Sequence, residues 1–421
     1  MKKLLILSTA LIALNATEIT NLFEAIKNMP ESKIDSVAVK QMKTQKQAIK
    51  GSLFPKLNIF ASTEHFSSPA NIKPQPPTYG VKFAKEGKGY WFSQNITKVG
   101  FSASMPLFVK EIYDNKAKVS HLINAKEYQK KINLLKREAL LVAYLSKLNY
   151  LFSLKNALFQ KESSIKTTLK AIEVGVNTGS IPKFKLLRLQ DALNQIQIKI
   201  TNINSSIDAT KADIYKLTKI KISKPINFNT YTIKQKSFLA LKPLEEVKKA
   251  NEYTIKAAKD KNYPSFMLKA QGYRAFANAY NKDDNLAENF ASIGIYMDWD
   301  VFDKTKDANI QKAQIENIKS NLQIQKTLKD LNAEVMKIDS TLKEIKKAIN
   351  LTENSITLKE ELLKDAKTAF EENSITVDEY LTYENNLADA KASLANLIAT
   401  KNTLLANKAF IYGNNLERIF K

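Results

Sequence analysis

Residues 99–108 of this chain read VGFSASMPLF, and residues 293–302 read IGIYMDWDVF. In both stretches the odd-numbered residues are apolar and the even-numbered ones are mostly small or polar. This alternation predicts a β-strand with one apolar face and one polar face. About ten residues is also the length of a tilted strand that crosses a membrane. A half-buried hairpin in a soluble sheet fits the same pattern equally well.

The two stretches belong to an internal repeat. Gly100 and Gly294 are 194 residues apart, and the same offset relates Ser180-Ile181 to Ser374-Ile375. Self-similarity at a fixed offset is the mark of a duplicated architecture. Pro55 and Pro264 precede a second pair of predicted strands, at residues 57–66 and 265–274. They are 209 residues apart, so the first half carries a loop that is 15 residues longer.

The longer loop is expected at residues 67–98, where four of the eleven prolines lie. Proline removes a backbone donor, so we predict neither a helix nor a central strand in this segment. Its counterpart in the second half, residues 275–289, is short and polar.

Long helices follow each strand pair. Glycine and proline are absent from residues 107–174, 183–224 and 303–412. A helix of 65 to 70 residues would be about 100 Å long, so it must pack along its length on neighbouring helices. Residues 175–179 and 371–374 interrupt the pattern at equivalent points and are predicted to reverse each helix into a hairpin.

The composition excludes several classes of chemistry. The chain has no cysteine and two histidines among 421 residues, so thiol catalysis and Cys-ligated metals are excluded, and we expect no enzyme activity and no cofactor. Lys and Arg total 65 against 42 Asp and Glu. The basic residues are mostly lysines spread along the chain, and we therefore predict no nucleic-acid partner.

Residues 1–16 are predicted to be a cleaved signal peptide. Lys2 and Lys3 precede an apolar run at residues 4–13, and Ala16 is a small residue at the expected cleavage point. An N-terminal membrane anchor is the alternative, but the run is too short to span a bilayer. Because cysteine is absent, the exported chain is not expected to be lipidated.

Four amphipathic strands per chain cannot close a barrel, and lipid does not tolerate an open sheet edge. Three copies would supply twelve strands, an even number within the range of outer-membrane barrels. The strand count therefore predicts a homotrimer surrounded by outer-membrane lipid.

The whole pattern resembles the outer-membrane efflux protein family, whose best-known member is TolC. The family's turn motif corresponds to residues 179–187, GSIPKFKLL, and to residues 373–381, NSITVDEYL. The chain departs from the family pattern after the strand-ending phenylalanines, where Val109-Lys110 and Asp303-Lys304 replace a glycine pair. Asn373 replaces the glycine of the second turn, and asparagine also tolerates left-handed geometry.

The resemblance implies a mostly α-helical chain with a transmembrane β-barrel. Each half would contain a strand hairpin and a long helical hairpin, and the trimeric twelve-stranded barrel would continue into an α-helical barrel. Residues 17–225 would form the first repeat, with strands at 57–66 and 96–108 and helices within 109–222. Residues 226–421 would form the second, with strands at 265–274 and 290–302 and helices within 303–412.

Candidate functional residues follow from the strand faces and the turns. We expect the lipid-facing side chains to be Phe101, Met105, Ile295 and Trp299. We expect the lumen-facing side chains to be Ser102, Ser104, Tyr296, Asp298 and Asp300. At the helical tips we predict a periplasmic aperture formed by Gly179, Asn373, Lys185 and Glu379. Two solvated surface charges are the alternative for Lys185 and Glu379.

These features predict an outer-membrane channel of a tripartite efflux or type I secretion system, a passive duct for small molecules or proteins. The resemblance implies two further partners, a periplasmic adaptor and an inner-membrane pump of the RND or ABC type. The alternative is a periplasmic coiled-coil structural or adaptor protein, which would carry one helical hairpin between short β modules instead of two hairpins in tandem.

Overall fold

A computed structural model describes residues 18–372 and 374–421. The predicted signal peptide and Asn373 lie outside these residues. The chain divides into two compact units, each with segments from both halves of the sequence. One unit, the helical unit, contains residues 18–39, 126–244 and 323–421, and the other, the sheet unit, contains residues 40–125 and 245–322.

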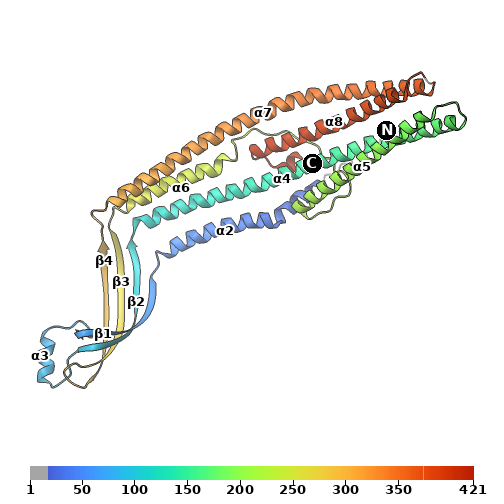
Figure 1. Cartoon of the computed structure of the whole chain (residues 1–421). Helices are drawn as coiled ribbons and strands as arrows, with labels where there is room; N and C mark the ends of the chain where they lie inside the picture. Colours follow the sequence, from blue (N-terminus) through green and yellow to red (C-terminus); the bar gives the residue numbers. More distant parts are fainter. Residues whose placement is uncertain (1–17, 373) are drawn as a thin grey trace, which may run out of the picture. The chain divides into compact units, whose positions relative to one another are not determined.

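The sheet unit is built on four antiparallel strands in the order β1-β2-β3-β4 (Figure 1). The strands are β1 (Lys56–Asn71), β2 (Phe92–Phe108), β3 (Ser265–Asn278) and β4 (Asn285–Asp298). The central pair β2–β3 joins the two halves of the sequence. Gly100 permits its close approach, because a Cβ at this position would lie 2.3 Å from the carbonyl oxygen of Gly272.

The connection between β1 and β2 corrects the prediction of a loop over residues 67–98. Both strands extend into this segment, and a short helix, α3 (Thr78–Lys85), lies between them. All four prolines, at 69, 74, 76 and 77, precede the first residue of the helix, and Pro77 occupies its N-cap. Residues 78–85 are therefore free of proline, and a helix can form there.

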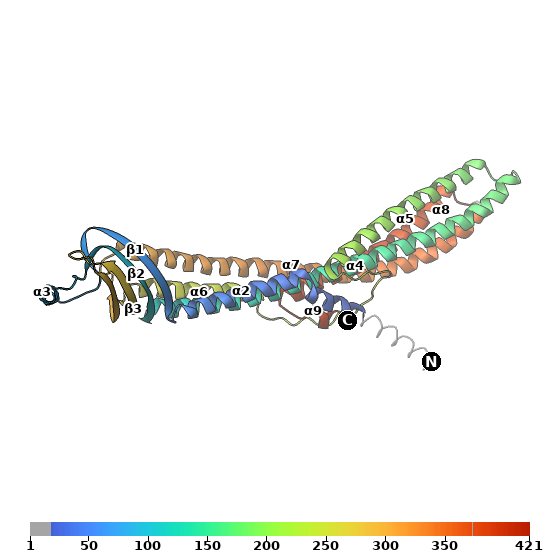
Figure 2. The same cartoon turned by 90° about the horizontal axis from the view of Figure 1, so that it is seen from below.

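The first and last residues of the two longest helices are related by the 194-residue offset. Helices α4 (Lys110–Asn177) and α7 (Lys304–Glu371) each have 68 residues, and both of their ends differ by the repeat offset. Helices α5 (Lys183–Thr218) and α8 (Val377–Ile411) follow the two turns. The two views show α5 beside the end of α4 and α8 beside the end of α7 (Figure 2). Helices α2 (Pro30–Gly51), α6 (Leu241–Asp260) and α9 (Leu416–Ile419) are shorter. Residues 18–28 are also helical.

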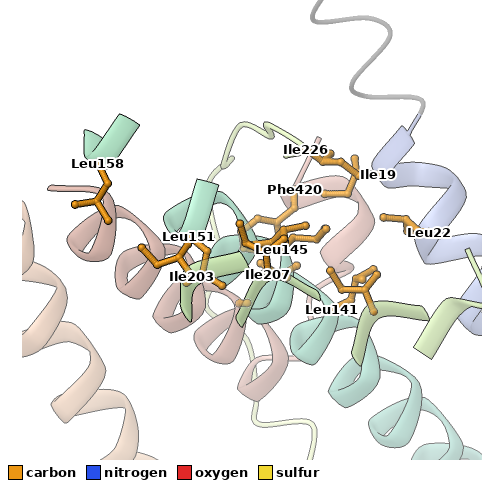
Figure 3. Packing of buried hydrophobic residues seen from close by; sticks show 14 of the residues in the cluster. Ile19, Leu22, Leu141, Leu145, Leu151, Leu158, Ile203, Ile207, Ile226 and Phe420 are labelled. Carbon is orange, nitrogen blue, oxygen red and sulfur yellow. The ribbon is translucent and has the colours of Figure 1, made fainter. Parts of the chain in front are cut away.

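The core of the helical unit is a continuous apolar cluster (Figure 3). Leu141 and Leu145 of α4 are fully buried, and Ile207 of α5 lies in the same cluster. Ile19 and Phe420, from the two ends of the described chain, are also fully buried in it. Burial of both terminal segments holds them to the hairpin helices through the hydrophobic effect.

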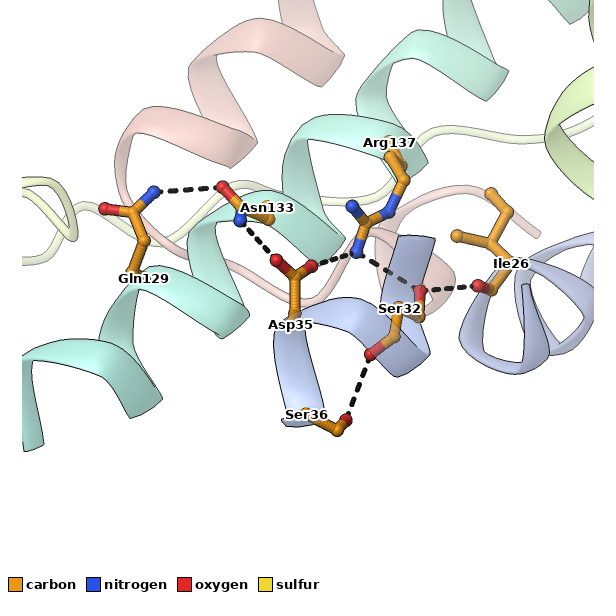
Figure 4. Close-up of polar contacts among 7 residues, drawn as sticks. All are labelled: Ile26, Ser32, Asp35, Ser36, Gln129, Asn133 and Arg137. Atoms are coloured by element: carbon orange, nitrogen blue, oxygen red, sulfur yellow. Dashed lines mark hydrogen bonds and ion pairs between the residues drawn. The ribbon is translucent and has the colours of Figure 1, made fainter. Parts of the chain in front are cut away.

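Polar contacts fix the start of α2 against α4 within the same unit (Figure 4). The guanidinium of Arg137 donates to the carboxylate of Asp35 at 2.6 Å and to the Ser32 hydroxyl at 3.1 Å. The Asn133 amide donates to the other Asp35 oxygen at 2.7 Å. Since these side chains are largely buried, the charge-assisted hydrogen bonds specify how the two helices meet.

Candidate channel-forming surfaces

One face of the sheet is apolar and exposed across all four strands. The register pairs Ile59 with Phe101, and Leu268 with Ile295, so these side chains share one face. Ile59 is 84% exposed and Ile293 is 74% exposed. The face also carries Leu57, Val99, Met105 and Met297. An exposed apolar surface that extends across four strands is typical of a membrane or protein contact.

The opposite face is polar over its middle rows. Ser102 pairs with Asn58 on one side and with Gln271 on the other, and Gln271 pairs with Ser292. Ser102, Ser104 and Tyr296 line a shallow hollow on this face together with Lys269. The Lys269 ammonium lies 4.8 Å from the centre of the Tyr296 ring. This face presents hydroxyl, amide and charged groups that suit contact with water.

The strand predicted at residues 290–302 extends four residues beyond the observed end of β4. Strand β4 ends at Asp298, which pairs with Ser265, the first residue of β3. Pro264 precedes that residue and has no N–H to continue the ladder. Trp299 and Asp300 therefore lie beyond the strand. The Trp299 indole donates to the carbonyl of Asn262 at 3.0 Å, and Asp300 lies 3.7 Å from the Lys306 ammonium.

The two turns at the helical tip have the same backbone bonds. The N–H of Ser180 donates to the carbonyl of Gly175 at 2.9 Å, and the N–H of Ser374 donates to the carbonyl of Ala369 at 2.8 Å. These pairs are related by the 194-residue offset. Gly179 has a φ of 74°, in the left-handed region that glycine adopts without strain.

Glu379 caps a helix at the tip. Its carboxylate accepts from the backbone N–H of Thr376 at 2.7 Å and from the Thr376 hydroxyl at 2.8 Å. The Glu379 N–H donates back to the Thr376 hydroxyl, which completes a capping box at the start of α8. The backbone hydrogen bond from Thr376 lowers the pKa of Glu379.

The first and second hairpins are joined at the tip by Arg188 and Asp378. The Arg188 guanidinium on α5 lies 2.6 Å from the Asp378 carboxylate on α8, and both side chains are exposed. Asp378 directly precedes Glu379, and Arg188 lies three residues after Lys185. The segments that are predicted to form the aperture therefore lie next to an ion pair between the two hairpins.

A buried polar network links α4 and α8 further from the turns. Tyr380 is fully buried, and its hydroxyl donates to the Glu384 carboxylate at 2.8 Å. The same hydroxyl lies 3.1 Å from the Ser164 hydroxyl. Its ring stacks on Phe370 with centroids 4.9 Å apart. Burial raises the pKa of Tyr380, and the satisfied network specifies the α4–α8 contact.

The sequence pattern alone does not single out Arg188, Asp378, Tyr380 or Glu384 as contact residues. Periodicity places each of them on a helix but does not show which helix faces which. The available signal was their position within ten residues after the two equivalent turns.

Comparison with known proteins identifies the fold. No protein-family model matches the sequence, and no curated protein matches it. The Campylobacter jejuni CmeC outer membrane channel is 17% identical and gives a TM-score of 0.77, with coverage of 95% of this chain and 86% of CmeC. The open-state MtrE outer membrane channel of Neisseria gonorrhoeae is 13% identical with a TM-score of 0.75, covering 95% and 90% of the two chains. The Vibrio cholerae outer membrane protein VceC is 13% identical with a TM-score of 0.74, covering 94% and 96%.

This chain has the fold of outer-membrane channels over nearly its whole length. The TolC-like fold expected from the sequence is confirmed. Within residues 18–372 and 374–421, no helix is both long enough and apolar enough to cross a membrane. The two tandem helical hairpins and the four-stranded sheet do not support the alternative of an adaptor with a single hairpin.

Proposed function

We propose that this chain is the outer-membrane channel of a tripartite efflux or type I secretion system. The observation that carries the proposal is the exposed apolar face of a four-stranded sheet, in a chain whose fold is that of outer-membrane channels. A face of this kind gains free energy when lipid replaces water around it, at about 25 cal/mol per Å² of apolar surface.

Three copies would close the sheet edges into a twelve-stranded barrel in the outer membrane. Phe101, Met105 and Ile295 would face lipid, and Ser102, Ser104, Tyr296 and Asp298 would line the lumen. The long helices would form an α-helical barrel in the periplasm, with the aperture at the turns that contain Gly179 and Asn373. A signal peptide at residues 1–16 would direct export without lipidation.

The channel would act as a passive duct without catalysis. A periplasmic adaptor would dock on the helical barrel, and an inner-membrane pump of the RND or ABC type would supply the energy. The polar lumen face, with its hydroxyl and amide groups, supports passage of solutes through water instead of chemical conversion.

Membrane fractionation and mass measurement in detergent test the proposal. We expect the chain in the outer-membrane fraction, as a particle of three copies that conducts ions in planar bilayers. A monomer in the soluble periplasmic fraction would contradict both the barrel and the channel.

A further inference from the structure

The sheet has two open edges. Among the described residues, β1 pairs only with β2, and β4 pairs only with β3. We infer that these edges pair between neighbouring copies in one defined register, with Lys56 of one copy opposite Asp298 of the next. The inference rests on the proposed trimer and adds the partner surface and its alignment.

The two faces of the sheet restrict the possible registers. Ile59 on β1 and Ile295 on β4 lie on the apolar face, as do the other odd-numbered residues in this part of both strands. A continuous apolar surface requires odd residues to meet odd residues across the seam. A slip by one residue would turn a whole strand over, so only steps of two residues are permitted.

The strand ends show in which direction the sheet is staggered. The row of paired residues that starts at Lys56 runs through Ser104, Lys269 and Gly294. The other three strands each extend four residues past this row, to Phe108, Ser265 and Asp298. If all four strands end at the same height along the barrel axis, the row of paired residues rises by four residues between Lys56 and Gly294. It then continues from Gly294 to Phe60 of the next copy.

A stagger of four residues per copy gives a strand tilt within the range of outer-membrane barrels. Four residues rise about 13 Å, and four strands are about 19 Å wide, which corresponds to a strand tilt of about 35°. Outer-membrane strands tilt by roughly 35–45°. A stagger of two residues would give a tilt of only about 19°, and zero stagger would leave the strands upright.

The side chains across the proposed seam complement one another. Lys56 faces Asp298, and both are exposed charges at the same end of the sheet. On the apolar face the register brings together Leu57 with Met297, Ile59 with Ile295, and Ala61 with Ile293. Cross-strand pairs of opposite charge and of apolar side chains are the contacts that stabilise a sheet.

Neighbouring registers lose this complementarity. A shift of two residues in one direction puts Lys56 opposite Tyr296 and leaves Asp298 beyond the start of β1. The other shift puts Lys56 opposite Asp300, which lies outside the strand and close to Lys306. The Lys56–Asp298 register pairs the first residue of β1 with the last residue of β4.

Disulfide crosslinking tests the register, because the native chain has no cysteine. Ser62→Cys with Ser292→Cys forms the matched pair. The control pairs, displaced by four residues, are Ser62→Cys with Glu288→Cys and Ser62→Cys with Tyr296→Cys. Within one chain β1 and β4 are separated by two strands, about 14 Å, which exceeds the reach of a disulfide. Any crosslink therefore reports the seam.

We expect covalent dimers and trimers from the matched pair after oxidation, and a loss of them in both controls. Opposed pairs alternate between hydrogen-bonded and non-hydrogen-bonded sites. Ile59→Cys with Ile295→Cys lies three rows away in the same register and samples the other kind of site. At least one matched pair should crosslink.

Crosslinking by a displaced pair in a trimer of normal mass would overturn the register and leave the proposed function standing. Absence of a trimer would overturn both.

Charge reversal provides an independent measurement. Lys56→Asp places two negative charges across each seam and should lower the temperature at which the trimer dissociates in detergent. Adding Asp298→Lys should restore it. Lys85→Asp reverses an exposed charge on α3, away from the seam, and serves as the control. A reversal at Lys56 that Asp298→Lys does not rescue would contradict the pairing.

Discussion

Glu138 is a carboxyl group with almost no exposure, on α4 in the helical unit. Burial raises its pKa to about 7, and the nearby carboxylates of Glu417 and Glu24 add to the shift against the opposing charges of Lys27 and Arg137. The folded protein therefore binds a proton here that the unfolded chain releases near pH 4.5. The contribution of this carboxyl group to the free energy of unfolding is fully present below that pH and is lost as the pH rises through 7.

Glu138→Gln should remove this pH dependence. The neutral amide avoids the cost of a buried charge, so the variant should be more stable than the parent at pH 8, by up to about 3 kcal/mol. At pH 5 the two should unfold at similar temperatures. Thermal unfolding at both pH values gives the difference. Glu173→Gln changes an exposed glutamate on the same helix, and an equal effect of both substitutions would contradict the assignment.

At the scale of an element, the β2–β3 pairing depends on the absence of a side chain at Gly100. A methyl group there would lie 2.3 Å from the Gly272 carbonyl oxygen and 2.5 Å from the Tyr273 Cβ. Gly100→Ala should force the strands apart and destabilise the sheet by about 1–3 kcal/mol. The fraction of trimer that resists heating in detergent measures the effect. Gly80→Ala on α3 meets open space and should leave this fraction unchanged.

The same elements show how far the sequence predicts the fold. Strict alternation predicts strand and face for Phe101, Ser102 and Ile295, because a period of two is a local property of a half-exposed sheet. The end of β4 could not be predicted, because it is determined by the start of its partner strand after Pro264. Helix α3 was missed because four prolines dominate the composition of its surroundings although none lies within it.

The candidate site was predictable only in part, for the same reason. The repeat offset located both turns and the segments around Gly179 and Glu379. The contact between Arg188 and Asp378 joins residues 190 positions apart, and it depends on how α5 and α8 pack. Helical periodicity contains no information about that choice. The ion pair is formed by Arg188, three residues after Lys185, and by Asp378, one residue before Glu379.

At the scale of the whole molecule, the proposed trimer would repeat the Arg188–Asp378 ion pair three times around the aperture. Each exposed pair contributes about 0–1 kcal/mol, so three pairs would bias the proposed aperture towards closure without locking it. Release of the pairs should therefore widen the resting aperture by a measurable amount. The capping box of Glu379 acts within one turn, and its loss should weaken the start of α8 instead.

Single-channel conductance of the purified trimer in planar bilayers distinguishes these roles. Arg188→Ala should raise conductance, and the exchange Arg188→Asp with Asp378→Arg should return it towards the parent value, because the opposite charges meet again. Lys183→Ala removes an exposed charge at the start of the same helix, α5, and should have little effect. If Arg188→Ala and Lys183→Ala change conductance equally, the response reports the loss of positive charge near the pore. The Arg188–Asp378 ion pair would then make no specific contribution to closing the aperture.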